Sequence, residues 1–351
     1  MDRRAFIVAL LATSGCGRKE EPKKAVEAPQ AAPSAAPQAA EARLILGGTL
    51  TRRVGYLAML PPASMEDFLA QLRPELEKRG WTEGRNIVFL EPRTAGSDNA
   101  RLPSLASELV AQGPDLILVQ SVPATRALMQ ATKSIPIVMT GVANPVELGI
   151  VASFAKPGGN VTGSSFIGNE FAGKLLQFLK EAAPRLRSVA VFVNPTNEAV
   201  PQFVKHMLAG AVALGMQAQV IEVSSPTEFE RAFVTIRSAN TESILLPPEP
   251  LIRSKRDAIA NFAQTHGLPL AVVGDTRVLP ASGLIAYGPT RDEYAHLAAR
   301  YVDRILRGAK PGDLSIEQPT RFHLVINLKA AKALGLTIPQ SLLLRADEKI
   351  E

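Results

Sequence analysis

Several polar side chains follow apolar runs of the chain, at positions where they could bind a small molecule by hydrogen bonds and by charge. These candidates are Gln120, Ser121, Asn144, Asn194, Thr196, Glu249, Asp275 and Tyr287. Each comes near the end of a predicted strand, and open α/β sheets bind their ligands beyond the carboxyl ends of the strands. The amides and hydroxyls would exchange hydrogen bonds with a ligand, and the two carboxylates would bind an ammonium group.

Most of these candidates also have a structural interpretation. Ser121 precedes Pro123, which begins a predicted helix. Its hydroxyl and the free N–H groups there could hold a carboxylate, or Ser121 merely caps its own helix. Asn144 has the same two interpretations. Glu249 and Asp275 either bind an ammonium group or are surface acids near helix starts, where the helix dipole favours them.

Strands and helices alternate in the first half of the chain. Strands are predicted at 53–60, 86–91, 115–119 and 135–139, with helices at 65–79, 99–112 and 123–131. The helix at 65–79 has apolar residues at helical spacing, which indicates one buried face. This alternation is typical of a parallel sheet covered by helices on both faces.

The stretch 140–165 is where we expect the chain to leave this first sheet. Residues 140–143 are predicted to form a Gly-containing loop, and Asn144 followed by Pro145 is predicted to start a short helix. A sharp turn at 156–160 leads into an extended segment at 161–165, which we interpret as the first crossing to a second lobe. The alternative is an ordinary helix-to-strand turn.

The pattern then restarts. Helices are predicted at 171–183, 200–214, 227–239 and 255–266, with strands at 188–193, 217–223, 243–246 and 270–273. Residues 283–287 are predicted to return the chain to the first lobe, where a helix at 292–307 packs. Residues 322–334 are expected to finish in the second lobe or at the hinge. Tyr287 therefore either contacts the ligand or fills the hinge.

Five segments resemble one known family when they are taken together, in order. They are VGYL at 54–57, GWTEGRNI at 80–87, PGGNVTG at 157–163, YGP at 287–289, and the tail 317–351 with EQPT, LVINLK and ALGLTIP. In these segments the chain resembles the ABC transporter substrate-binding proteins of the family that includes tryptophan- and tyrosine-binding members. The resemblance covers residues 53–351.

The resemblance implies a two-lobed periplasmic binding protein of the type I plan, each lobe a parallel sheet covered by helices on both faces. It implies an exported monomer, not an enzyme, that captures a small molecule between its lobes and delivers it to an ABC permease and ATPase. The alternative is a sensor of the same fold that signals to a membrane receptor. An aromatic amino acid is the ligand that the relatives imply. Asn144-Pro145, Glu249-Pro250 and Thr276-Arg277 depart from the family pattern in the presumed cleft.

Composition excludes several other classes. The net charge of +6 comes from scattered Lys and Arg residues without interleaved aromatics, so we expect no nucleic-acid partner. The four histidines lie far apart in the sequence and form no metal-ligand spacing. No dinucleotide, P-loop or nucleophile-elbow motif is present, so we expect no cofactor, no metal and no catalytic residues.

The first 52 residues are expected to direct and tether the protein. Two arginines followed by a short apolar run resemble a twin-arginine export signal over residues 1–16. Cys16, the single cysteine, follows small residues as in a lipobox, so we expect it to carry a lipid anchor. The alternative is an incidental cysteine in a signal that is cleaved elsewhere. Residues 17–52 are rich in Ala and Pro and predict a disordered tether. The first lobe is predicted over 53–163 and 284–315, and the second lobe with the hinge over 164–283 and 316–351.

Overall fold

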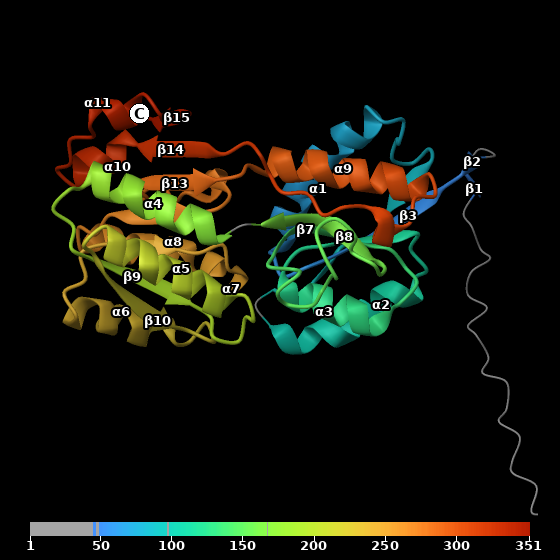
Figure 1. Ribbon diagram of the computed structural model, residues 1–351, viewed down its shortest axis with the longest axis horizontal. Helices are drawn as coiled ribbons and strands as arrows, with labels where there is room; N and C mark the ends of the chain where they lie inside the picture. Colours follow the sequence, from blue (N-terminus) through green and yellow to red (C-terminus); the bar gives the residue numbers. More distant parts are fainter. Residues whose placement is uncertain (1–44, 47–48, 97, 167) are drawn as a thin grey trace, which may run out of the picture. The chain divides into compact units, whose positions relative to one another are not determined.

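The computed structural model describes residues 45–46, 49–96, 98–166 and 168–351, which all fall in one compact unit. The export signal, Cys16 and most of the predicted tether lie outside these residues. A short antiparallel pair, β1 (Ile45–Leu46) and β2 (Thr49–Leu50), comes first in the chain. Two larger sheets follow, and each forms the centre of one lobe (Figure 1).

The first sheet has six strands, in the order β4-β3-β6-β7-β8 with β5 also paired to β3. Their bounds are β3 (Arg52–Ala58), β4 (Ile87–Phe89), β5 (Arg93–Thr94), β6 (Leu116–Val119), β7 (Ile137–Ala143) and β8 (Val161–Phe166). Every pair in this sheet is parallel. Strand β6 is buried at all four positions. This continuous apolar run is what a strand covered on both faces requires.

Helices cover both faces of the first sheet. On one face lie α1 (Pro62–Glu77) and α9 (Arg291–Leu306), and on the other α2 (Leu102–Ala111) and α3 (Val122–Ala131), as Figure 1 shows. Helix α1 has Pro at its start, where no N–H is needed. Its buried residues recur at helical spacing: Met65, Phe68, Leu69, Leu72 and Leu76. Fully burying a side chain of this size stabilises the fold by about 1.5–3 kcal/mol.

The second sheet has seven strands, in the order β10-β9-β11-β12-β13-β14-β15. Their bounds are β9 (Ser188–Val193), β10 (Gln217–Glu222), β11 (Ile244–Leu246), β12 (Leu270–Val273), β13 (Ile285–Gly288), β14 (His323–Asn327) and β15 (Glu348–Ile350). All pairs are parallel except β13 with β14, which run antiparallel. The fold is thus the predicted α/β, two-lobed binding-protein architecture, with a single antiparallel step in the second sheet.

Two apolar clusters sandwich this second sheet. One joins it to α4 (Gly168–Ala182), α5 (Val200–Ala213), α10 (Leu328–Ala333) and α11 (Gln340–Leu343). The other joins it to α6 (Phe229–Ser238), α7 (Pro250–Ser254) and α8 (Arg256–Thr265). The described residues also include short 3-10 helices at η1 (Asn99–Arg101), η2 (Thr276–Val278) and η3 (Pro311–Asp313). No helix among the described residues is both long enough and apolar enough to cross a membrane.

The chain passes between the lobes at positions that differ from those predicted. Strand β8 stays in the first sheet as far as Phe166, so the crossing follows residue 166 instead of lying within 161–165. The prediction that residues 283–287 return the chain to the first lobe is wrong. Ile285 and Ala286 are fully buried, and as part of β13 they pair with β12. The return comes at α9, which packs against the first sheet.

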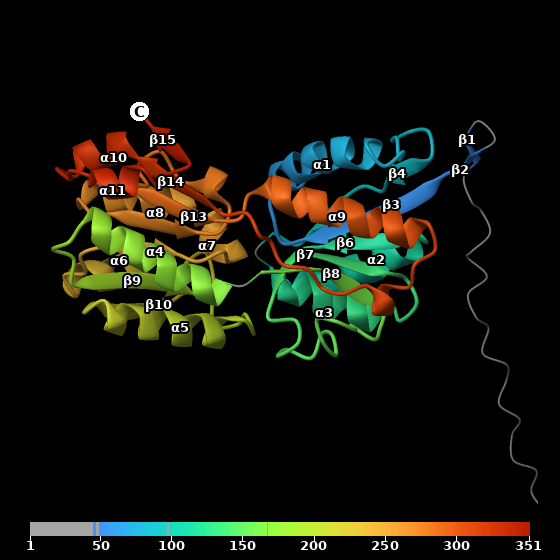
Figure 2. The same ribbon diagram turned by 45° about the horizontal axis from the view of Figure 1, so that its top comes forward.

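The chain crosses for the last time at residues 317–322, between Glu317, which pairs with β8, and β14 of the second sheet. This crossing and the return at α9 contact each other at the hinge (Figure 2). Glu293, near the start of α9, accepts a hydrogen bond from the Thr320 N–H at 3.3 Å and pairs with the Arg321 guanidinium at 2.6 Å. Glu317 pairs in parallel with Ser164 of β8. Segments far apart in the sequence are therefore fixed side by side where the lobes join.

The short helix predicted at Asn144 is absent. Strand β7 continues through residues 140–143 with a bulge at Gly141, whose φ is +75°. The left-handed backbone suits glycine, and the bulge lets Val142 and Ala143 pair with the end of β8. Hydrogen-bonded turns follow, in which the Leu148 N–H donates to the Asn144 carbonyl at 3.0 Å. The predicted loop is thus strand, and the predicted helix is a series of turns.

Candidate ligand-binding site

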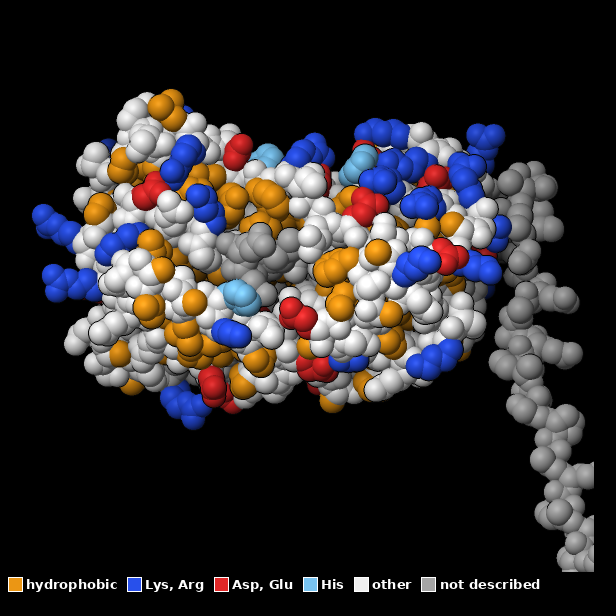
Figure 3. All heavy atoms as spheres, viewed as in Figure 1, with side chains coloured by type: hydrophobic (Ala, Val, Ile, Leu, Met, Phe, Trp, Pro, Cys, Tyr) orange, Lys and Arg blue, Asp and Glu red, His pale blue; other side chains and the backbone are white. Residues whose placement is uncertain are grey.

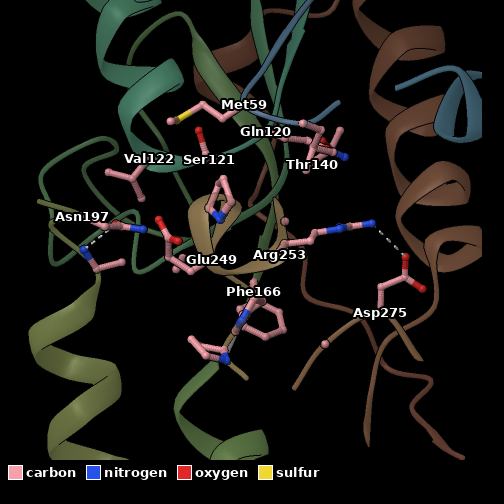
Figure 4. A pocket seen from close by; sticks show the side chains of 18 of the residues that line it. Met59, Gln120, Ser121, Val122, Thr140, Phe166, Asn197, Glu249, Arg253 and Asp275 are labelled. Atoms are coloured by element: carbon pink, nitrogen blue, oxygen red, sulfur yellow. Dashed lines mark hydrogen bonds and ion pairs between the residues drawn. The ribbon is translucent and has the colours of Figure 1, made fainter. Parts of the chain in front are cut away.

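A cavity of about 200 Å³ lies between the lobes, at the carboxyl ends of the strands. Figure 4 shows side chains from both sheets converging on it. Most of its wall is apolar, built from Met59, Leu60, Phe68, Val122, Ala143, Phe166, Val193, Ala199, Val200, Phe203, Pro247, Pro248 and Pro250. A mostly apolar wall with a few placed polar groups is the usual construction of a small-molecule site.

The first lobe contributes Gln120, Ser121 and Asn144 to the cavity, as predicted from their places after β6 and β7. Ser121 has φ +82° and Asn144 has φ +47°, both unusual for residues other than glycine. Ser121 also caps α3, because its hydroxyl accepts a long hydrogen bond of 3.4 Å from the Ala124 N–H. The structure therefore shows the helix-capping role of Ser121, and the residue also lies in the cavity wall.

The second lobe contributes Glu249, which follows β11 and begins α7. One carboxylate oxygen accepts from the Ile252 N–H at 2.9 Å, and the other accepts from the Asn194 amide at 3.1 Å. The residue is only 5% exposed. Burial raises the pKa of this carboxyl, although its hydrogen bonds act in the opposite direction. Among the residues that the structure describes, no cation is paired with Glu249.

Asn194 and Thr196 do not line the cavity. Asn194 is buried and its side-chain Nδ2 donates to Glu249, while its side-chain Oδ1 accepts from the Thr196 hydroxyl at 2.8 Å and from the Thr196 N–H at 3.1 Å. Asn194 thus holds one carboxylate oxygen of Glu249, and Thr196 holds the side chain of Asn194. Both were predicted as ligand contacts from their place at a strand end, and neither lines the cavity.

Asp275 lines the cavity beside two arginines. Its carboxylate oxygens lie 3.9 Å from Arg253 Nη2 and 3.7 Å from Arg277 Nε, and one of them accepts from the Arg277 N–H at 3.2 Å. Figure 4 shows Arg253 extending from α7 toward Asp275, away from Glu249. The negative charge of Asp275 is thus matched within the protein, which distinguishes it from Glu249.

Tyr287 lies away from the cavity. Its ring packs against Phe178 at 5.1 Å and Phe171 at 6.0 Å between centroids, within the apolar cluster of the second lobe. Burial raises the pKa of its hydroxyl, with a further contribution from Asp347. Tyr287 belongs to β13 and packs in the second-lobe core, so its position does not match the predicted ligand contact. Its ring also lies 6.2 Å from that of Phe322, next to the last crossing between the lobes.

The sequence also matches a known protein family. The family described as ABC transporter substrate binding protein matches residues 54–350. The chain belongs to this family. A tyrosine-binding protein from Clostridioides difficile (strain R20291) is 26% identical over 288 residues, which is 81% of each chain.

Two solved structures share the fold of this substrate binding protein over most of its length. An ABC domain from Streptococcus pneumonia in complex with L-Trp matches with a TM-score of 0.78 at 24% identity, covering 86% of this chain and 100% of the other. A conserved domain protein from Vibrio cholerae o1 biovar eltor matches with a TM-score of 0.79 at 26% identity, covering 85% and 99%.

Hydrogen bonds also join the two lobes of this substrate binding protein. Arg126 on α3 donates to Glu198 of the second lobe at 3.0 Å, and Arg277 donates to Gln71 on α1 at 2.9 Å.

On the face shown in Figure 3, Lys and Arg side chains are dispersed over both lobes, with Asp and Glu among them. Within the described residues no cluster of His, Cys, Asp and Glu could hold a metal ion.

Sequence reasoning missed several residues of the wall. Arg253, Thr140, Phe166 and Tyr294 all line the cavity. Arg253 carried a usable signal, because it lies four residues after Glu249 on a helix that starts at a strand end, and such residues share a helix face. Tyr294 carried no such signal, because it lies within the helix predicted at 292–307, which was expected only to pack in the first lobe.

Proposed function

We propose that this protein captures an amino acid between its lobes and delivers it to an ABC permease with its ATPase. The observation that carries the proposal is that Glu249 and Arg253 both line one mostly apolar cavity without being paired to each other. Glu249, the cap of α7, is a buried acid with no paired cation among the described residues, and Arg253 on α7 carries a guanidinium. Together they match the ammonium and carboxylate groups of a zwitterion. In this proposal the protein performs no chemistry.

Glu249 binds the ligand's ammonium group in a charge-assisted hydrogen bond. Asn194 and the start of α7 hold the carboxylate in place before the ligand arrives. Folding already removes the Glu249 carboxylate from water, which is unfavourable for a charged group. A ligand ammonium group beside it would offset this unfavourable free energy. Preorganisation of this kind raises affinity because less ordering is required on binding.

Arg253 binds the ligand's carboxylate. Its guanidinium is oriented by Asp275, and planar guanidinium groups suit carboxylates because they can donate two parallel hydrogen bonds. Gln120, Ser121 and Asn144 extend the hydrogen-bonding set from the first lobe. Both lobes must then close on one ligand, which is the hinge mechanism of two-lobed binding proteins.

An aromatic amino acid is the ligand class we propose. The side chain would lie against the apolar wall, where Phe68, Phe166 and Phe203 come from different elements. Aromatic rings favour tilted and edge-to-face contacts with one another. Two similar proteins support this choice, one named a tyrosine-binding protein and the other solved with L-Trp.

We further propose that the protein acts outside the cytoplasm as a monomer, exported by its N-terminal signal and anchored by lipid on Cys16. The support is the paired arginines, the short apolar run and the small residues before Cys16. One acyl chain gives only marginal membrane binding, so stable anchoring needs more than one.

The test is a thermal-shift screen of the purified protein with the twenty common amino acids, followed by calorimetric titration of those that bind. A ligand that binds only the folded state raises the melting temperature. We expect an aromatic amino acid to give the largest rise. Stabilisation by a neutral sugar with no response to any amino acid would overturn the proposed ligand class.

A further inference from the structure

One hydroxyl group in the cavity wall has no hydrogen-bond partner. Tyr294 lies in the first turn of α9 and lines the cavity. Its hydroxyl oxygen is buried and unpartnered among the residues that the structure describes. Buried polar groups are nearly always hydrogen-bonded, because losing water without a replacement is costly. The hydroxyl is therefore an unfilled hydrogen-bonding position.

The position of the ring is fixed by its neighbours. It packs against the apolar clusters of both lobes. It also lies against Gly141, where an added Cβ would stand 2.9 Å from a ring carbon and 3.4 Å from the hydroxyl oxygen. Only glycine at the bulge of β7 leaves room for this ring. The hydroxyl cannot readily turn away to find another partner.

The surroundings keep the hydroxyl protonated. Burial raises the pKa of Tyr294 well above its ordinary value, and the negative charges of Asp275 and Glu293 raise it further. A neutral phenol donates one hydrogen bond. The neighbouring carboxylate of Asp275 is already paired with Arg253 and Arg277.

The geometry points to Tyr294 as a specificity-determining residue whose hydroxyl donates a hydrogen bond to an acceptor oxygen of the bound ligand. The inference rests on the proposed function, because it takes this cavity to be the ligand site. It adds that the site discriminates against ligand analogues that place an apolar group against the Tyr294 hydroxyl. Such analogues would leave the buried hydroxyl unpaired, and sites built this way reject them strongly.

The test compares Tyr294→Phe with Tyr301→Phe. Both tyrosines are on α9, but the Tyr301 hydroxyl donates to the Ser315 carbonyl at 2.6 Å and does not line the cavity. The probe is the amino acid that binds wild-type protein most tightly in the panel of twenty. Affinity is measured by calorimetric titration, and the melting temperature of the ligand-free protein is measured for all three proteins.

We expect Tyr294→Phe to weaken binding on the order of tenfold, the typical effect of deleting one buried hydrogen bond. Its ligand-free melting temperature should equal or exceed that of wild type, since no internal bond is lost. Tyr301→Phe should show the reverse, with a lower melting temperature and unchanged affinity.

Two results would overturn the inference. One is wild-type affinity in Tyr294→Phe, which would mean that the ligand does not contact the hydroxyl. The other is a fall in ligand-free melting temperature as large as that of Tyr301→Phe, which would mean that the hydroxyl has a partner within the protein. If no amino acid binds wild type, the proposed ligand class fails, and the melting comparison still decides whether the hydroxyl is unpartnered.

Discussion

Replacing Glu249 with glutamine separates a ligand-binding carboxylate from a helix cap. Glutamine keeps the side-chain length and one oxygen, which can accept from either the Ile252 N–H or the Asn194 amide. Its NH2 group then faces the other donor, so about one hydrogen bond is lost, roughly 0.5–1.5 kcal/mol of stability. That loss is partly offset because a buried charge disappears. The ligand-free protein should remain folded with little change in melting temperature.

The effect on the ligand should be larger. A hydrogen bond to a charged group contributes about 1.5–3 kcal/mol, and every 1.4 kcal/mol is about tenfold in affinity. Calorimetric titration of Glu249→Gln with the best amino-acid ligand should therefore show an affinity about 10- to 100-fold lower than wild type. The control is Glu222→Gln, which removes the same charge from an exposed glutamate at the end of β10 in the same lobe. It should bind as wild type does.

A refuting result is equally specific. If Glu249→Gln binds with wild-type affinity while its melting temperature falls by several degrees, Glu249 is a structural cap of α7. The ammonium site would then pass to Asp275, which also lines the cavity.

Three further changes are expected to act through the same site or through the anchor. Because burial raises the pKa of Glu249 above 4.5, the acid takes up a proton before an ordinary glutamate does as pH falls, so ligand affinity should drop from about pH 7 to about pH 4. In Glu249→Gln this dependence should vanish, and a parallel drop in both proteins would exclude Glu249 as its source. Asp275→Ala should weaken binding several-fold because Arg253 loses an orienting partner; unchanged affinity together with a large fall in melting temperature would make Asp275 a structural cap of η2. Cys16→Ser should move the protein from membrane to soluble fractions, and a wild-type protein that is already wholly soluble and carries no lipid by mass spectrometry would contradict the anchor.

The fold was largely predictable because its signals are local. Apolar runs such as Leu116–Val119 and the helical spacing on α1 identify strands and helices without reference to distant parts of the chain. The placement of β13 was not predictable in the same way. Its residues are apolar enough to be buried in either sheet, and only pairing with β12 decides between them. The bulge at Gly141 likewise depends on β8, which must be present before β7 can extend beside it.

The candidate site was predictable where a polar residue directly follows a strand. Gln120 and Asn144 are of this kind, Ser121 and Glu249 follow two and three residues after a strand, and the strand ends of parallel sheets bring them to one edge. Arg253 and Tyr294 come from helices, and their contribution depends on how those helices pack. Asn194 follows a strand but does not line the cavity. Its side chain donates a hydrogen bond to Glu249 instead.

The most direct test of the central claim is a crystal structure of the protein with the amino acid that stabilises it most. The proposal predicts the ligand in the cavity between the lobes, with its ammonium nitrogen within hydrogen-bonding distance of Glu249 and its carboxylate on Arg253. A ligand bound outside this cavity, or one whose ammonium group lies away from every carboxylate of the site, would contradict it.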